Sequence, residues 1–112
     1  MIKTFGEFVR EKRDAMDISL REFAKRLGDI SPAHISDIEN GRRYPSDELL
    51  RKMSHVLGVT VTELEKHDSR APVDELRRMV QKDPAYGVAL RRIAETKVDP
   101  TELLKFIDKK KQ

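Results

Sequence analysis

Signals that start and stop helices recur at short intervals along the sequence. These signals constrain the fold more than any other feature. Ser19 is a favourable helix N-cap, and Gly28 is a residue type at which helices commonly stop. The Ser-Pro pair at 31–32 marks the next start, and the Asn-Gly pair at 40–41 marks the next stop. Helices this short are marginal in isolation, because few hydrogen bonds offset the cost of forming the first turn. The sequence therefore predicts short helices that must pack against one another.

The same signals predict further helices on both sides of this segment. An apolar stripe at helical spacing covers residues 5–15, and cap and stop signals bound another helix at 46–57. Residues 19–22 and 60–63 each place Ser or Thr three positions before Glu, which is the pattern of a capping box. The second of these boxes predicts one more short helix, the fifth of the series.

The pattern loosens at residues 68–72, which we interpret as a linker. Three weaker helices are predicted after it, each with one apolar stripe and each too short to fold alone. Their apolar stripes must pack against another surface. Three surfaces remain possible: their own bundle, a second copy of the chain in a dimer, or a partner protein. The sequence thus predicts an all-α chain with one domain at 1–68 and a helical extension at 69–112.

Composition narrows the classes of function. The chain has no cysteine, which excludes disulfides, thiolate zinc sites and cysteine nucleophiles. It also lacks a zinc-binding helix motif, a phosphate-binding loop and a supported Ser/His/Asp arrangement, so we expect neither an enzyme nor a metal or cofactor site. No apolar run approaches the roughly 18 residues of a membrane span, and the first residues do not resemble a signal peptide. We expect a cytoplasmic protein.

Three stretches carry a resemblance to a known family. They are Ser19-Leu-Arg-Glu-Phe-Ala, the turn Leu-Gly-Asp-Ile-Ser-Pro, and Ile35-Ser-Asp-Ile-Glu-Asn-Gly-Arg-Arg-Tyr-Pro-Ser. Together with residues 50–59 they closely resemble the Cro/cI-type (XRE) helix-turn-helix regulators, over roughly residues 5–66. The resemblance implies a five-helix, lambda-repressor-like DNA-binding bundle whose third helix, residues 32–40, enters the DNA major groove.

The third helix has two predicted faces. Ile35 and Ile38 share one face, which suits packing in a core. Ala33, His34 and Asp37 fall on the other side, and their positions in the resemblance imply base contacts. The implied partners are a thymine methyl for Ala33, a guanine acceptor for His34 and a cytosine amino group for Asp37. The alternative is an ordinary solvated helix face.

The resemblance also implies contacts to DNA phosphates. Arg42, Arg43 and Tyr44 follow the third helix at positions where family members contact the backbone, and Asn40 lies beside them. Arg21 in the first turn of the second helix offers a positive charge next to free backbone amides. Such contacts position a protein on DNA without specifying sequence. The alternative is unpaired surface charge.

Arg13 and Glu39 match a pair that bridges the first and third helices in the family, and the pair would orient the third helix. Two residues depart from the family pattern. Leu20 stands where the family usually has Gln, a residue that braces the DNA backbone. Asp29 lengthens the turn between the second and third helices by one residue relative to the commonest pattern.

Charge gives no support for DNA binding by the first domain. The net charge of the chain is +3, but residues 1–68 hold 12 Lys and Arg against 13 Asp and Glu. Residues 69–112 hold 11 basic against 7 acidic residues, so the basic excess lies in the extension. A first domain that binds DNA must therefore use a local patch of positive charge.

Two functions remain in competition. The first is a dimeric transcriptional regulator, a repressor that occludes an operator of double-stranded DNA, with residues 69–112 as a candidate dimerisation or partner-binding segment. A two-fold dimer reads two half-sites about one helical turn apart, which a single small domain cannot do. The second is an antitoxin whose residues 69–112 bind a toxin and whose DNA binding is autoregulatory.

Overall fold

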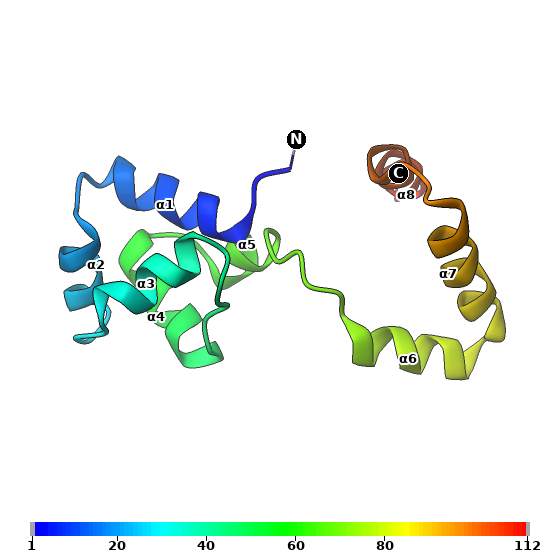
Figure 1. The fold of residues 1–112 in the computed structure, drawn as a ribbon, viewed down its shortest axis with the longest axis horizontal. Helices are drawn as coiled ribbons and strands as arrows, with labels where there is room; N and C mark the ends of the chain where they lie inside the picture. The colour runs from blue at the N-terminus through cyan, green and yellow to red at the C-terminus, as the bar shows by residue number, and fades with distance from the viewer. Residues whose placement is uncertain (1, 112) are drawn as a thin grey trace. The chain divides into compact units, whose positions relative to one another are not determined.

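The computed structural model describes residues 2–111, so Met1 and Gln112, the outer ends of the two predicted domains, lie outside the described residues. The described residues form eight α-helices and no strand, which confirms the predicted all-α class (Figure 1). By its contacts the chain divides into two compact units, Met1–Arg70 and Ala71–Gln112. The division follows Arg70, whereas we predicted a boundary after residue 68.

Five short helices build the first unit. In each case the Ser or Thr directly before the helix (residues 4, 19, 31, 46 and 60) accepts a hydrogen bond from the backbone N–H three residues on. The predicted starts are thereby confirmed. The helices are α1 (Phe5–Ala15), α2 (Leu20–Arg26), α3 (Pro32–Glu39), α4 (Asp47–Leu57) and α5 (Val61–Glu65).

One of the two predicted capping boxes is complete and the other is half formed. Thr60 and Glu63 exchange both hydrogen bonds, so this box is confirmed. Ser19 accepts from the backbone N–H of Glu22, but the Glu22 carboxylate pairs with Arg26 Nε at 3.1 Å instead of turning back. The cationic partner one turn ahead offers a charged interaction that the neutral N-cap amide does not.

The core of the first unit joins all five helices. Ile35 and Ile38 are fully buried with Phe23 and Leu27, and Ile30 packs against the edge of the same cluster, as predicted. Burying one side chain of this size stabilises the fold by about 1.5–3 kcal/mol. The third helix is therefore held by one face, and its other face is left outside the core. The buried apolar residues are Phe5, Val9, Phe23, Ala24, Leu27, Ile35, Ile38, Leu49, Leu50, Met53, Leu57 and Leu64.

Gly6 allows α1 to approach the end of α3 more closely than any other residue would. A Cβ placed on Gly6 would lie 2.2 Å from the backbone oxygen of Glu39, a separation that real Cβ atoms do not show. The position is buried, and it lies within the complete capping box that Thr4 and Glu7 form at the start of α1. Packing of α1 on α3 thus requires glycine here.

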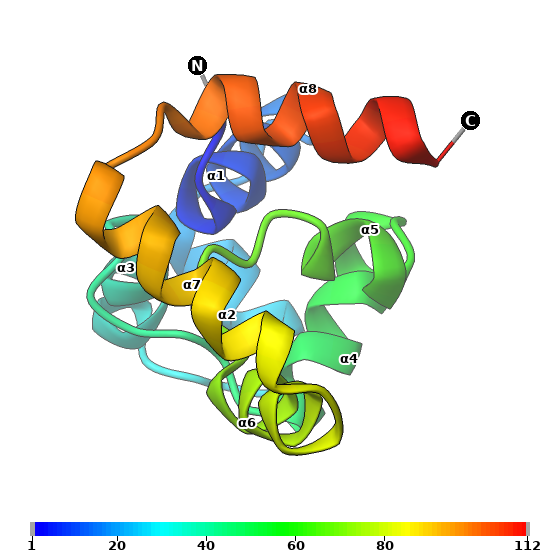
Figure 2. The same ribbon diagram turned by 90° about the vertical axis from the view of Figure 1, so that its right-hand side faces the viewer.

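The second unit differs from the first because it has no buried core. Its helices are α6 (Val73–Lys82), α7 (Pro84–Thr96) and α8 (Pro100–Lys110), at the three places that the sequence predicts. Within the unit α6 packs on α7, and a short link joins α7 to α8 (Figure 2). None of residues 71–111 is buried. The apolar stripes of this unit therefore stay largely open to solvent in the single chain.

We expect Gly6→Ala to lower the free energy of unfolding by about 3 kcal/mol, because the added methyl group must push α1 off α3. The matched control is Gly58→Ala, since Gly58 ends α4 with φ +68° and its Cβ would meet no atom within 4 Å. The control should cost only the backbone strain, about 1 kcal/mol. Denaturant unfolding followed by circular dichroism measures both, and equal losses would contradict the close approach.

Candidate nucleic-acid interface

Two consecutive left-handed residues make the turn between α2 and α3. Gly28 has φ +100° and Asp29 has φ +59°. Glycine adopts this conformation without steric cost, and Asp is one of the few other residues that tolerate it. The Ile30 N–H then donates to the carbonyl of Ala24 at 3.2 Å, and Ser31 caps α3. The residue that lengthens the turn relative to the family pattern is thus accommodated within a hydrogen-bonded turn.

The outward face of α3 carries the three predicted base-contact residues. Ala33 is exposed, and His34 and Asp37 are half-buried. The buried face opposite them belongs to the core of the unit. The structure therefore presents all three side chains from one short helix whose back is fixed.

The end of α3 directs the chain toward this same face. Gly41 has φ +80°, its N–H donates to the carbonyl of Ile38, and the Arg42 N–H donates to the carbonyl of Asp37 at 2.8 Å. This pair of hydrogen bonds is the Schellman ending, in which a left-handed glycine reverses the chain and satisfies the last carbonyls of the helix. Arg42 and Arg43 follow at once, both exposed.

Each of these arginines lies beside a predicted base-contact residue. Arg42 Nη1 is 3.7 Å from Asp37 Oδ1, a loose and solvent-exposed ion pair. Arg43 Nη1 lies 3.1 Å from His34 Nδ1, which accepts when the imidazole is neutral and carries its proton on Nε2. Exposed pairs of this kind contribute little to stability, so a stronger ligand can displace them. The predicted base and phosphate contacts thus form one contiguous group.

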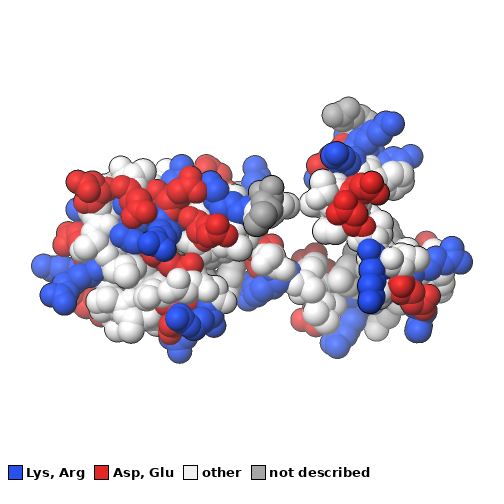
Figure 3. Space-filling view, turned by 45° about the horizontal axis from the view of Figure 1, so that its top comes forward, with Lys and Arg blue, Asp and Glu red and all other residues white. Residues whose placement is uncertain are grey.

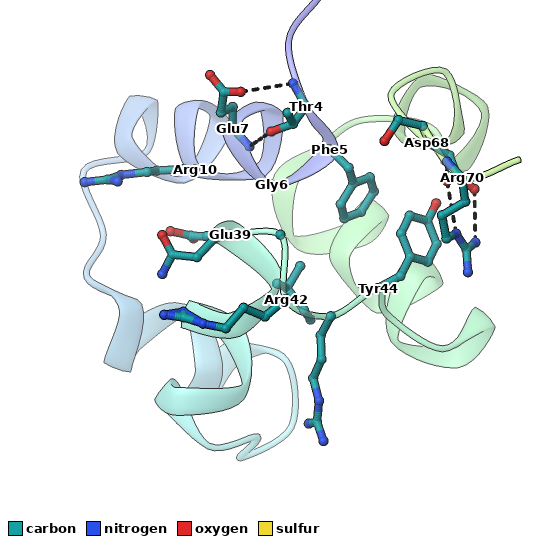
Figure 4. Close-up of a pocket in the computed structure, with 15 residues that line it drawn as sticks. Thr4, Phe5, Gly6, Glu7, Arg10, Glu39, Arg42, Tyr44, Asp68 and Arg70 are labelled. Atoms are coloured by element: carbon teal, nitrogen blue, oxygen red, sulfur yellow. Dashed lines mark hydrogen bonds and ion pairs between the residues drawn. The ribbon is translucent and has the colours of Figure 1, made fainter.

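The remaining predicted phosphate contacts lie near this group or on α2. Asn40 is exposed and its Nδ2 donates to Ser36 Oγ at 3.2 Å, while Arg21 is exposed on the first turn of α2. Arg10 on α1 is a further exposed cation, and Figure 4 shows its guanidinium extending to the same side as that of Arg42. Arg10 was not among the predicted residues.

The side chain of Tyr44, for which we predicted a phosphate contact, is enclosed in the structure. Its hydroxyl is buried and has no hydrogen-bond partner, and its ring lies 4.7 Å from that of Phe5. Burial, followed by the charge of Asp68, raises the pKa of the hydroxyl above its ordinary value. The guanidinium of Arg70 covers the ring at 3.6 Å from its centroid (Figure 4). The only polar atom of the Tyr44 side chain is therefore enclosed.

Arg13 and Glu39 form the predicted pair, and it is buried. Arg13 Nε donates to Glu39 Oε2 at 2.8 Å and Nη2 donates to Oε1 at 3.2 Å, while Nη1 donates to the carbonyl of Ile18 at 2.8 Å. The hydrogen bond to Glu39 raises the pKa of Arg13, and burial opposes that rise. Planar two-point pairing fixes orientation as well as distance. One guanidinium therefore joins α1, the last turn of α3 and the chain before α2.

A hollow of about 650 Å³ lies between the start of α1 and the loop after α3 (Figure 4). Its lining includes arginines and also Glu7, Glu39 and Asp68, so it is not uniformly basic. On the face drawn in Figure 3, acidic and basic side chains likewise intersperse. Among residues 2–111, no group of three or more His, Asp and Glu is arranged to hold a metal ion, and no helix is long and apolar enough to cross a membrane.

Sequence reasoning missed the residues whose roles depend on distant partners. Gly6 left a faint signal, because a small residue stands inside the apolar stripe of α1. Asp68 and Arg70 left none, since they fall in the segment interpreted as a linker.

The sequence profile of the helix-turn-helix family matches residues 9–64, which is half of the chain. The chain belongs to the helix-turn-helix family of the Cro/cI (XRE) type. The matched span runs from within α1 to within α5 and includes every residue of the α2-turn-α3 segment. The predicted family is therefore confirmed.

Named relatives resemble parts of the chain. An uncharacterised HTH-type transcriptional regulator of Mycobacterium tuberculosis is 34% identical over 55 residues, which are 49% of this chain and only 39% of that protein. The ImmF control region 10 kDa protein of Bacillus phage phi105 is 34% identical over 62 residues, 55% of this chain and 68% of that one. A solved complex of the SinR and SinI proteins aligns with a TM-score of 0.52 and 28% identity, covering 96% of this chain and 95% of the other.

We expect Glu39→Ala to lower the free energy of unfolding by about 3–5 kcal/mol, because it leaves the Arg13 charge buried without a partner. The control is Glu48→Ala, which removes an exposed pair with Lys52 and should cost under about 1 kcal/mol. Replacing both partners, Arg13→Met with Glu39→Leu, should recover most of the loss. Equal costs for the two single alanine variants in denaturant unfolding would refute a buried, compensated pair.

Tyr44→Phe removes the enclosed hydroxyl and keeps the ring. We expect the free energy of unfolding to stay level or rise by about 1 kcal/mol, because a buried polar atom without a partner destabilises the fold. Affinity for duplex DNA should not change. A loss of DNA affinity at unchanged stability would restore Tyr44 as a direct phosphate contact.

Proposed function

We propose that the first unit binds double-stranded DNA with α3 in the major groove, and that the chain acts as a dimeric transcriptional repressor. The observation that carries this proposal is the way α3 is held. Its back is fixed by the core and by the Arg13–Glu39 pair, while its front and the loop that follows present polar side chains together. A binding helix that is rigid before it meets its ligand loses little entropy on binding.

An α-helix such as α3 has a diameter that fits the DNA major groove. An α-helix with its side chains is about 10–12 Å across, and the groove is about 12 Å wide. The exposed side chains then take the roles that the family resemblance implies. We assign base contacts to Ala33, His34 and Asp37, where Arg42 beside Asp37 offsets the acidic charge that phosphates would repel.

We assign phosphate contacts to Arg21, Asn40, Arg42 and Arg43, and we withdraw Tyr44 from this group. The two arginines after α3 carry most of the proposed positive patch. The first 68 residues as a whole are slightly acidic, so their total charge does not favour binding to DNA. Binding should therefore depend on this local patch and should weaken steeply as the salt concentration rises. The Arg13–Glu39 pair serves as the proposed orienting pair for α3.

We propose that the second unit supplies the dimer contact. Of the ten large hydrophobic residues exposed among residues 2–111, nine lie between Val73 and Ile107. Phe106 on α8, for example, is 60% exposed. Apolar side chains exposed together in this way indicate a surface that binds another protein. We favour a second copy of the chain as the covering surface. A dimer joins two helix-turn-helix domains, which can then bind two DNA half-sites.

A protein partner is the second candidate for this surface. The aligned SinR chain was solved in complex with SinI, which is a different protein. By analogy, residues 71–111 would bind an unlike partner, of which the toxin of a toxin–antitoxin pair is one example. Both candidates require the open apolar faces of α6, α7 and α8, and they differ in what covers them.

Selection of bound duplexes from a random DNA pool by the full chain tests the proposal. We expect an enriched motif with two-fold symmetric halves, and Asp37→Ala should relax the preference at one or two base positions. Arg42→Ala should weaken binding to all sequences and reduce the slope of log affinity against log salt by about 0.9. Arg51→Ala is the matched control, since Arg51 is also exposed but lies on α4.

Failure of the wild-type chain to enrich any motif would contradict sequence-specific DNA binding. An enriched motif without symmetry, from a chain that sediments as a monomer, would contradict the dimer and leave the protein partner as the covering surface.

A further inference from the structure

The segment that follows α5 folds back onto the first unit. We call residues 67–70 the strap. The His67 ring stacks on the ring of Phe8 in α1, with centroids 4.1 Å apart and planes 17° from parallel. The His67 and Asp68 N–H groups continue the turn of α5 by donating to the carbonyls of Leu64 and Glu65. The strap is thus an ordered part of the first unit and not a free linker.

Arg70 is held in one orientation by its neighbour Asp68. Asp68 Oδ1 accepts hydrogen bonds from the backbone N–H and the Nε of Arg70, and Oδ2 accepts one from Nη2, all at 3.0 Å. The side-chain hydrogen bond from Arg70 is the main cause that lowers the pKa of Asp68, so the contact is intact at neutral pH. It is lost as the pH falls from the ordinary carboxyl range through that lowered pKa. A guanidinium fixed in this way presents a flat face.

That flat face lies on Tyr44. The guanidinium carbon of Arg70 is 3.6 Å from the Tyr44 ring centroid, within the range of a cation–π contact. Phe5 of α1 contacts the same ring at 4.7 Å, so the ring is enclosed between the strap and α1 (Figure 4).

The ring anchors one end of the loop that bears Arg42 and Arg43. The other end is anchored by the Schellman ending at Gly41, where the Arg42 N–H donates to α3. The two arginines are exposed and make only the loose contacts to Asp37 and His34 described above. The path of the loop between its anchors therefore sets where their guanidinium groups lie.

We propose that Arg70 is a positioning residue for DNA binding, acting through Tyr44 to fix the loop that carries Arg42 and Arg43. The inference rests on the proposed phosphate contacts of these two arginines. Ala71, the next residue after Arg70, begins the second unit.

A double-mutant cycle separates this role from a direct contact between Arg70 and phosphate. The variants are Arg70→Ala, Tyr44→Leu and the two combined, with Arg77→Ala on α6 as the matched control for a lost exposed charge. The probe is a random-sequence DNA duplex, titrated over a range of salt concentrations. We expect Arg70→Ala and Tyr44→Leu each to lose about threefold to fivefold in affinity, and the combined variant to lose no more than either alone.

Arg70→Lys sharpens the comparison, since lysine keeps the charge but cannot be held by both oxygens of Asp68. Positioning predicts that Arg70→Lys behaves like Arg70→Ala. Wild-type affinity in Arg70→Lys, or unchanged affinity in Tyr44→Leu, would show a direct phosphate contact and overturn the proposal. Additive losses in the combined variant would overturn it too.

A measurement without DNA keeps the inference independent of the proposed function. Hydrogen exchange of the full chain should show faster exchange at the Gly41 and Arg42 amides in Arg70→Ala, with the α1 amides unchanged. If the wild-type chain binds no DNA, the proposed function fails while the exchange data still decide whether Arg70 orders the loop. Unchanged exchange at Gly41 and Arg42 would overturn the positioning role.

Discussion

The buried pair of Arg13 and Glu39 joins the helix that begins the chain to the helix that carries the proposed contacts. Taking two charges out of water costs several kcal/mol per ion, and the pairing offsets that cost only with good geometry. Here the guanidinium meets both carboxylate oxygens and the Ile18 carbonyl, so its donors are largely satisfied. The same junction contains Gly6, whose missing side chain lets α1 reach the backbone at Glu39. We propose that this junction orients α3 more than it adds net stability.

The sequence predicts well those features whose causes lie within one helical turn. N-caps, glycine stops and the apolar faces of α3 depend on residues three or four positions apart, and the predicted helices are present. The half-formed box at Glu22 shows the limit, because Arg26 competes for the same carboxylate. The enclosure of Tyr44 was not predicted, for another reason. Its partners, Phe5 and Arg70, are distant in sequence, so nothing local indicates that its hydroxyl is enclosed.

The two units differ in how they bury their apolar side chains and in their charge. The first closes a core around one face of α3 and leaves the other face outside the core. The second exposes its apolar stripes and holds the basic excess of the chain, 11 basic against 7 acidic residues over 69–112. Two regions could therefore attract nucleic acid, the small arginine patch after α3 and the charged extension. Bulk charge favours the extension, whereas preorganised geometry favours the helix-turn-helix.

Amide chemical shifts of the full chain, recorded as a selected DNA duplex is added, distinguish these regions most directly. We predict that the largest changes fall on residues 31–44, with smaller ones at the start of α2, because the fixed helix and its following loop meet the groove. Changes confined to residues 71–111, with α3 and its loop unaffected, would contradict DNA reading by the helix-turn-helix.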